Sequence, residues 1–184
     1  MLVLAVAVAA VGLAGCDSSS PDEVGAAPSI GAAPSTGAAP STGVAPSAAD
    51  IGALAPCTLL TDAERAGMNL GAGQDRMNDG HRVCAFPATD ESFVVAVSVY
   101  PDEGLDDIVP DTVLKGPLRI GRHDAVQHHE NRIVCVYSIA VGTSSSVDVG
   151  STYAKQAKDI TPDDFARSCE RAQQAAALIE PRLP

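Results

Sequence analysis

Four cysteines spread along the C-terminal part of this 184-residue chain constrain its fold more than any other feature. They are Cys57, Cys84, Cys135 and Cys169, and no two of them form a Cys-x-x-Cys pair. In an oxidising compartment such cysteines cross-link a domain, whereas in the cytoplasm they stay reduced or bind a metal. Disulfides and reduced or metal-bound cysteines give different folds. The N-terminal sequence favours disulfides, because it resembles a signal for export.

Residues 1–15 have the composition of a secretory signal peptide. They carry no charge, and after Met1 they consist only of Leu, Val, Ala and Gly. A transmembrane helix needs about 20 apolar residues, and here the polar run Asp17–Ser20 follows too soon. Signal peptides normally begin with Lys or Arg. None precedes this apolar run, so we expect a basic segment upstream of Met1.

The predicted signal peptide ends in Leu13-Ala14-Gly15-Cys16, which resembles the lipobox of bacterial lipoproteins. In a lipobox, small residues precede a cysteine whose thiol receives diacylglycerol and which becomes the acylated N-terminus. Each buried methylene contributes about 0.8 kcal/mol, so two or three acyl chains hold a protein almost permanently. We therefore predict lipidation of Cys16 and attachment to the extracytoplasmic face of the cell membrane. The alternative is an ordinary cleaved signal peptide followed by a chance cysteine.

Residues 16–49 are predicted to be a disordered linker behind the lipidated cysteine. A six-residue unit, Gly-Ala-Ala-Pro-Ser-x with small variations, repeats from Gly25 to Ala48. It contains almost no large apolar side chain, so it cannot bury enough surface to offset the entropy of ordering. Residues 50–184 then have the length of one extracytoplasmic domain.

The odd number of cysteines supports this division of the chain. Once Cys16 is assigned to the lipid, four of the five cysteines remain, and an even number in an exported domain indicates two disulfides. Three connectivities are possible. We favour Cys57 with Cys84 and Cys135 with Cys169, each closing a loop worth about 3 to 4 kcal/mol in the loop-entropy model. A zinc site is the rival interpretation, and we expect neither a metal nor another cofactor.

The charge balance bears on possible partners. The chain has 12 Lys and Arg against 23 Asp and Glu, giving a formal net charge of -11. Nucleic acids and anionic lipid surfaces are bound through basic patches, so we expect no nucleic-acid partner. The expected membrane contact is the lipid on Cys16, and the partner of the folded domain is an unknown envelope protein or ligand.

The hydropathy pattern of residues 50–184 predicts an α+β fold. Thr61 and Glu64 form a capping-box pattern before a short helix, and residues 71–80 form a polar loop with a turn at Asn78-Asp79-Gly80. Alternating apolar residues then indicate an antiparallel sheet of five or six strands. The predicted strands are 82–86, 93–99, 118–120, 124–128, 133–141 and 146–151.

A long helix is predicted after Thr161, running to about Glu180. Apolar residues at three- and four-residue spacing place Cys169 on the side that faces the sheet. On the strand 133–141, Cys135 falls on the apolar face, which is why we pair it with Cys169. We therefore expect this helix to pack on one face of the sheet.

No residue pattern indicates catalysis strongly. His128 and His129 are interpreted as surface residues beside a turn, because neighbours on a strand point to opposite faces. His123-Asp124 lacks a nucleophile beside it, and Gly71-Ala72-Gly73 lacks the third glycine of a dinucleotide loop. The acidic residues between 102 and 111 do not follow a calcium-loop spacing, so we interpret them as a solvated connection, either a short helix or a loop.

The cysteine contexts resemble an actinobacterial lipoprotein family known as domain of unknown function 3558. The segments that carry the resemblance are Pro56-Cys57-Thr58-Leu59-Leu60, Thr61-x-x-Glu64, Cys84-Ala85-Phe86, Val134-Cys135-Val136 and Ser168-Cys169-Glu170-Arg171-Ala172. Phe86 occupies a position where members of the family often have Trp. The resemblance implies a surface location and two disulfides, and it implies no activity or catalytic residue.

Three functional hypotheses remain open from the sequence. The first is a lipid-anchored, non-enzymatic binding or interaction module at the cell envelope. The second is a carrier of a small apolar or lipid ligand enclosed between the strand 93–99 and the terminal helix. The third is a weak hydrolase that uses His123 or His128 with a nearby acid.

Overall fold

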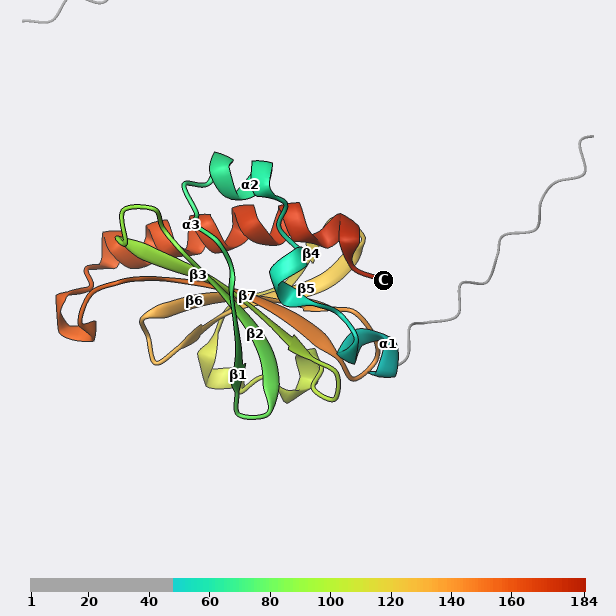
Figure 1. The fold of residues 1–184 in the computed structure, drawn as a ribbon. Coiled ribbons are helices and arrows are strands. Elements are labelled where there is room, and N and C mark those ends of the chain that lie inside the picture. The colour runs from blue at the N-terminus through green and yellow to red at the C-terminus, as the bar shows by residue number, and fades with distance from the viewer. Residues whose placement is uncertain (1–47) are drawn as a thin grey trace, which may run out of the picture. The chain divides into compact units, whose positions relative to one another are not determined.

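A computed structural model describes residues 48–184, which form one antiparallel sheet with helices (Figure 1). The predicted signal peptide, Cys16 and the predicted linker up to residue 47 lie outside the described residues. The described sheet has seven strands in the order β1-β2-β3-β7-β6-β5-β4. Their bounds are β1 Gln74–Asn78, β2 His81–Pro87, β3 Phe93–Tyr100, β4 Val113–Ile120, β5 His123–Glu130, β6 Val134–Ala140 and β7 Ser146–Tyr153.

The sheet consists of two meanders that meet in its middle. Strands β1 to β3 follow one another through hairpins, as do β4 to β7. The segment 101–112 crosses from the end of β3 to the far edge, where β4 begins, and contains two 3-10 turns, η2 (Leu105–Asp107) and η3 (Pro110–Thr112). The chain then returns strand by strand until β7 pairs with β3 over eight residues, from Phe93 opposite Tyr153 to Tyr100 opposite Ser146.

In the described part of the chain, three α-helices lie outside the sheet. They are α1 Ala48–Gly52, α2 Asp62–Gly67 and α3 Pro162–Ile179. Helix α3 runs along one face of the sheet (Figure 1). Thr161 caps it by accepting the backbone N–H of Asp164, while the Asp164 carboxylate accepts the Thr161 N–H. No helix within residues 48–184 combines the length and the apolarity that crossing a bilayer requires.

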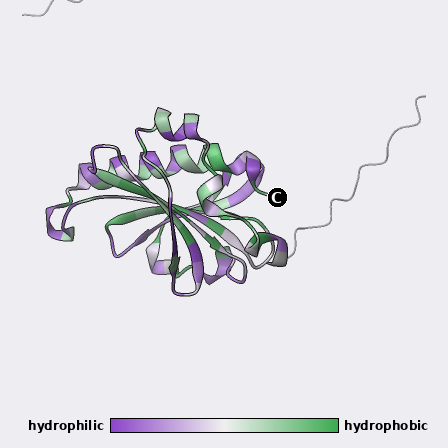
Figure 2. Cartoon of the chain, in the orientation of Figure 1, coloured by the Kyte–Doolittle hydropathy of each residue, from purple (hydrophilic) through white to green (hydrophobic). Residues whose placement is uncertain are grey.

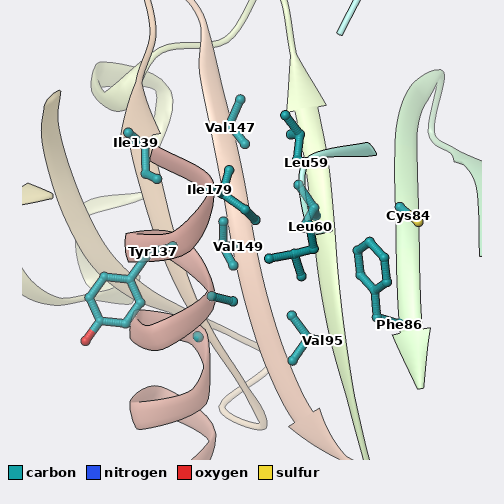
Figure 3. Close-up of a cluster of buried hydrophobic side chains, with 14 of the residues drawn as sticks. Leu59, Leu60, Cys84, Phe86, Val95, Tyr137, Ile139, Val147, Val149 and Ile179 are labelled. Carbon is teal, nitrogen blue, oxygen red and sulfur yellow. The ribbon is translucent and has the colours of Figure 1, made fainter. Parts of the chain in front are cut away.

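The core lies between the sheet and α3, as expected from the alternating strands. Along β3 every second residue is buried, and along α3 the buried side includes Ala172, Ala176 and Ile179, each with no exposed surface. Figure 3 shows Ile179 of α3 beside Val147 and Val149 of β7. Figure 2 shows the hydrophobic colour concentrated on the strands and the hydrophilic colour on the loops.

Two disulfides tie the outer elements to this core. Cys57, in the 3-10 turn η1 (Pro56–Thr58), bonds to Cys84 on β2, and Cys135 on β6 bonds to Cys169 on α3. These are the two pairs favoured from the sequence. Gly73 lies directly against the first disulfide, because a Cβ there would lie 2.6 Å from the Cys84 Sγ and 2.8 Å from the Phe86 ring. A side chain at position 73 would therefore push β1 away from β2.

The α+β class and the terminal helix are confirmed, but the number of strands and two local predictions are wrong. Residues 74–78 form β1 and not part of a loop. All five residues of this edge strand are exposed, so neither face has an apolar pattern to read. The β1–β2 hairpin turns at Asp79 and Gly80, whose φ values of 48° and 88° match a two-residue hairpin turn. Strand β4 begins at Val113, five residues before its prediction, because two register shifts break its alternation.

We predict that removing the second disulfide destabilises the domain substantially. The variant Cys135→Ala/Cys169→Ala should lose about 3 to 4 kcal/mol of unfolding free energy, because a cross-link between residues 34 apart no longer restricts the unfolded chain. Urea unfolding followed by circular dichroism measures the loss. The wild-type protein in reducing agent is the control and should move in the same direction. An unchanged urea midpoint in the variant would contradict the prediction.

Candidate functional site

A pocket of about 370 Å³ opens on the face of the sheet that is turned away from α3. It lies between the crossing segment 101–112 and the adjoining parts of β3, β5 and β7. Figure 1 shows the yellow-green turns of this segment on the side of the sheet opposite α3. The lining residues that matter most for its chemistry are Tyr100, Glu103, Ile108, His128, Glu130 and Asp148.

Strand alternation places the polar side chains of the pocket on this face. Val147 and Val149 face α3, so Asp148 between them points the other way. Register then puts Ser98 and Ser138 directly opposite Asp148 on the two neighbouring strands. These three residues form a polar strip across the middle of the sheet.

A buried polar cluster forms the floor of the pocket. The Nε2 atom of His128 lies 2.9 Å from the Ser138 Oγ and 3.9 Å from the Asp148 Oδ2. His128 is only 7% exposed and Ser138 is fully buried. The Asp148 Oδ1 atom is buried and has no hydrogen-bond partner within the described residues. The floor thus contains an acceptor whose hydrogen-bonding capacity is unused.

Burial changes the protonation of this cluster. It raises the pKa of Asp148 to about 7, and the charges of Glu130 and Glu103 add to the rise while the hydrogen bond with Ser138 opposes it. Burial also lowers the pKa of His128, with a further contribution from His129. Near neutral pH, the floor therefore holds a neutral imidazole and a carboxyl group that is close to its titration midpoint.

The cluster contains Ser, His and Asp but lacks the arrangement of a catalytic triad. In a triad, the acid orients one ring nitrogen and the serine hydroxyl bonds to the other. Here Ser138 and Asp148 both approach the same nitrogen, His128 Nε2. Ser138 has no exposed surface, so a substrate cannot reach its hydroxyl in this arrangement. The geometry is that of a hydrogen-bonded floor.

His123 lies at a different position and holds the C-terminal residues. Its Nδ1 is 3.0 Å from the Glu180 Oε1, and its Nε2 is 3.0 Å from the Pro184 carbonyl oxygen. The Glu180 Oε1 also accepts the backbone N–H of Arg122, at 2.9 Å. This hydrogen bond is the main reason why the pKa of Glu180 is lowered. Both ring nitrogens of His123 therefore have partners in the fold.

The structure brings some of the sequence candidates together and separates others. The interpretation of His128 as a surface residue is wrong, because the crossing segment and its neighbouring strands bury it. His129 and two acids of the 102–111 stretch, Glu103 and Asp107, also line the pocket. Gly71 and Gly73 instead lie beside β2, where the Gly71 N–H donates to the Pro87 carbonyl at 2.7 Å. Within residues 48–184, no cluster of three or more His, Cys, Asp or Glu could hold a metal ion.

Sequence reasoning missed Asp148, Ser138 and Tyr100 as site residues. The pattern Val147-Asp148-Val149 was a usable signal, since an acid between two buried valines lies in the middle of a sheet. What the pattern did not indicate was that the segment 101–112 covers that face. The pocket exists only because this segment, distant from β7 in sequence, lies over it.

Together these features define a disulfide-linked α+β domain with an antiparallel sheet, one covering helix and an open pocket on the other face. The chain belongs to the family described as Protein of unknown function (DUF3558), whose model matches residues 11–182. No curated protein and no solved structure matches the chain significantly. The match confirms the predicted domain of unknown function 3558, while the actinobacterial and lipoprotein character of the family stays a prediction.

We predict that Asp148 makes stability fall as pH rises toward neutrality. Its pKa is about 7 in the folded state against 3.8 as the ordinary value, so folded protein binds a proton between these values that unfolded protein has released. Stability from this group is thus present below about pH 4 and lost by pH 7. The variant Asp148→Asn should gain unfolding free energy relative to wild type as pH rises from 4 to 8.

Urea unfolding at several pH values measures this difference. The unfolding free energy of wild type is subtracted from that of Asp148→Asn at each pH. This removes the contribution of His128, whose lowered pKa makes stability rise with pH in both proteins. Asp159→Asn, at an exposed position, is the control and should track the wild type. A difference between Asp148→Asn and wild type that does not change with pH would show that the carboxyl is not buried as described.

Proposed function

We propose that this protein is a lipid-anchored, non-enzymatic binding module on the extracytoplasmic face of the cell membrane. The observation that carries the proposal is the pocket of about 370 Å³ beside a buried polar floor. Concave sites with a few convergent polar groups and perturbed pKa values are the usual places where proteins bind ligands. The pocket is the binding site in this proposal.

The anchoring part of the proposal is supported by the order of sequence features. An uncharged apolar run, small residues, Cys16 and a Pro-rich repeat follow one another as in a lipoprotein. The family match begins at residue 11, so Leu13-Ala14-Gly15-Cys16 falls inside the matched region. The two disulfides are also consistent with an oxidising compartment.

The proposal that the protein is not an enzyme is supported by the geometry of His123 and His128, the two candidates for a general base. His123 is engaged by Glu180 and by a backbone carbonyl, and His128 by Ser138. A general base needs a substrate proton within hydrogen-bond reach and a nucleophile to activate. The hydroxyl nearest to His128 is buried, which favours binding over hydrolysis.

The carrier hypothesis placed a ligand between β3 and α3, where side chains fill the space. Val95 and Val97 of β3 and Ala172 and Ala176 of α3 have no exposed surface there. The pocket opens on the other side of the sheet. We therefore propose recognition at an open pocket over enclosure of a ligand in the core.

We predict that Cys16→Ser releases the protein from the membrane. The full chain, expressed in a bacterium with its complete leader, should move from the membrane fraction to the soluble fraction, because it loses the acyl chains. Labelled palmitate should be incorporated into the wild type and not into the variant. Ser20→Ala is the control for a change in the linker and should stay in the membrane fraction. Cys16→Ser found in the membrane fraction at an unchanged level would refute the anchor.

We predict that the pocket face, and not the α3 face, contacts the partner or ligand. A photoreactive residue at Val109, which lines the pocket and is 59% exposed, should give a specific crosslinked product in membranes of the host. The same residue at Gln174, exposed on α3, is the matched control and should give none. Mass spectrometry of the products identifies what is attached. Equal yields at the two positions would contradict a binding role for the pocket.

A further inference from the structure

The charged side chains that line the pocket are all acidic or imidazole groups. Four carboxylates, those of Glu103, Asp107, Glu130 and Asp148, border it, and no Lys or Arg does. The chain as a whole contains 12 Lys and Arg, and most of those described form ion pairs elsewhere, for example Lys155 and Arg167 with Asp164. No Lys or Arg in the lining therefore offsets the charge of these carboxylates.

Two of the carboxylates have little to satisfy them inside the protein. Glu130 makes no side-chain hydrogen bond or ion pair within the described residues, and the Asp148 Oδ1 is buried without a partner. In the other two, one oxygen has a partner. Asp107 accepts the Gly104 N–H at 2.7 Å, and Glu103 lies 3.4 Å from the His81 Nε2. The pocket thus has acceptors left over for a ligand.

The carboxylates of the lining act on the neighbouring groups of the pocket. Burial raises the pKa of Tyr100 to about 12, and the charges of Asp148, Glu130 and Glu103 contribute to the rise. Glu130 and Glu103 also raise the pKa of Asp148. Two separate lining groups therefore feel the same negative potential, which would attract a cation and repel an anion.

The pocket also has an apolar side. Ile108, Val109 and Tyr100 line it. Within the described residues, four large hydrophobic side chains are exposed, and three of them, Val109, Val113 and Leu114, lie in one short stretch that begins at the pocket. Val113 pairs with His128 in the β4–β5 ladder. A ligand with an apolar portion would cover part of this stretch.

We propose that the pocket binds a small organic cation, an ammonium or guanidinium group carried on a short apolar chain. This inference rests on the proposed binding function of the pocket and names the class of ligand. The cationic group lies between Glu103 and Glu130, and the apolar chain contacts Ile108 and Val109. A metal ion is a poorer fit, since the described residues offer no cluster of three ligands.

The test is a titration of the mature full chain in nonionic detergent with four probes of similar size. The probes are n-butylammonium, n-butylguanidinium, n-butanol and butyrate. Binding is measured from the shifts of the backbone amide signals in nuclear magnetic resonance spectra. The two cations should shift the signals of pocket residues and bind about tenfold more tightly than butanol, a difference of about 1.4 kcal/mol. Butyrate should bind more weakly than butanol. Comparison of the two cations shows which cationic group is preferred.

Glu103→Gln/Glu130→Gln should lose most of this preference for cations, because it removes two of the three exposed carboxylates at the pocket while keeping their shape. Glu91→Gln/Glu170→Gln is the matched control, since it removes two exposed charges outside the pocket and changes the net charge equally. It should bind like the wild type. Equal affinity for butylammonium and butanol, or equal loss in the two double variants, would overturn the cation assignment. The crosslinking at Val109 tests the binding function separately, so that function could stand after the cation assignment failed.

Discussion

The pairing of β3 with β7 is the interaction on which the rest of the structure depends. It joins two meanders that are otherwise separate, through eight consecutive pairs from Phe93 to Tyr100. The same ladder sets both faces of the sheet. Val97 and Val149 lie opposite each other on the α3 side, and Ser98 and Asp148 lie opposite each other on the pocket side. A shift of one residue would exchange the two sets and place Asp148 in the core.

The two faces of the sheet are stabilised in different ways. Both disulfides are on the α3 side, because Cys84 pairs with Val97 in the sheet and Cys135 bonds to Cys169 of the helix. Within residues 48–184, no α-helix covers the polar strip on the pocket side. This side carries Asp148 instead. Burial raises the pKa of Asp148 to about 7, because a buried position is unfavourable for a charge. A domain stabilised mainly on one face can retain a polar, less stable arrangement on the other.

Elements whose signals lie within a few neighbouring residues were predicted well from the sequence. Features that depend on contacts with distant segments were not. Helix α3 was predictable because Thr161 caps it and its apolar positions repeat within the helix itself. Strand β1 was not, since its stability comes from hydrogen bonds to β2 and its residues are all exposed. The burial of His128 was also not predictable. It requires the segment 101–112 to cross the sheet, and no local pattern encodes that path.

The crossing segment is the part of the pocket that is least tied to the rest of the domain. Its hydrogen bonds in the described structure are local, such as Asp107 N–H to Gly104 O at 3.2 Å and Thr112 N–H to Val109 O at 3.0 Å. It therefore lies on the sheet through side-chain packing and the contact of Glu103 with His81. Neither disulfide restrains it. Such segments generally open at a lower free energy than a cross-linked core, so we expect the wall carrying Glu103 and Ile108 to open before the core does. If the pocket binds a ligand as proposed, a wall without a cross-link beside a cross-linked core would let it fit that ligand without disturbing the core.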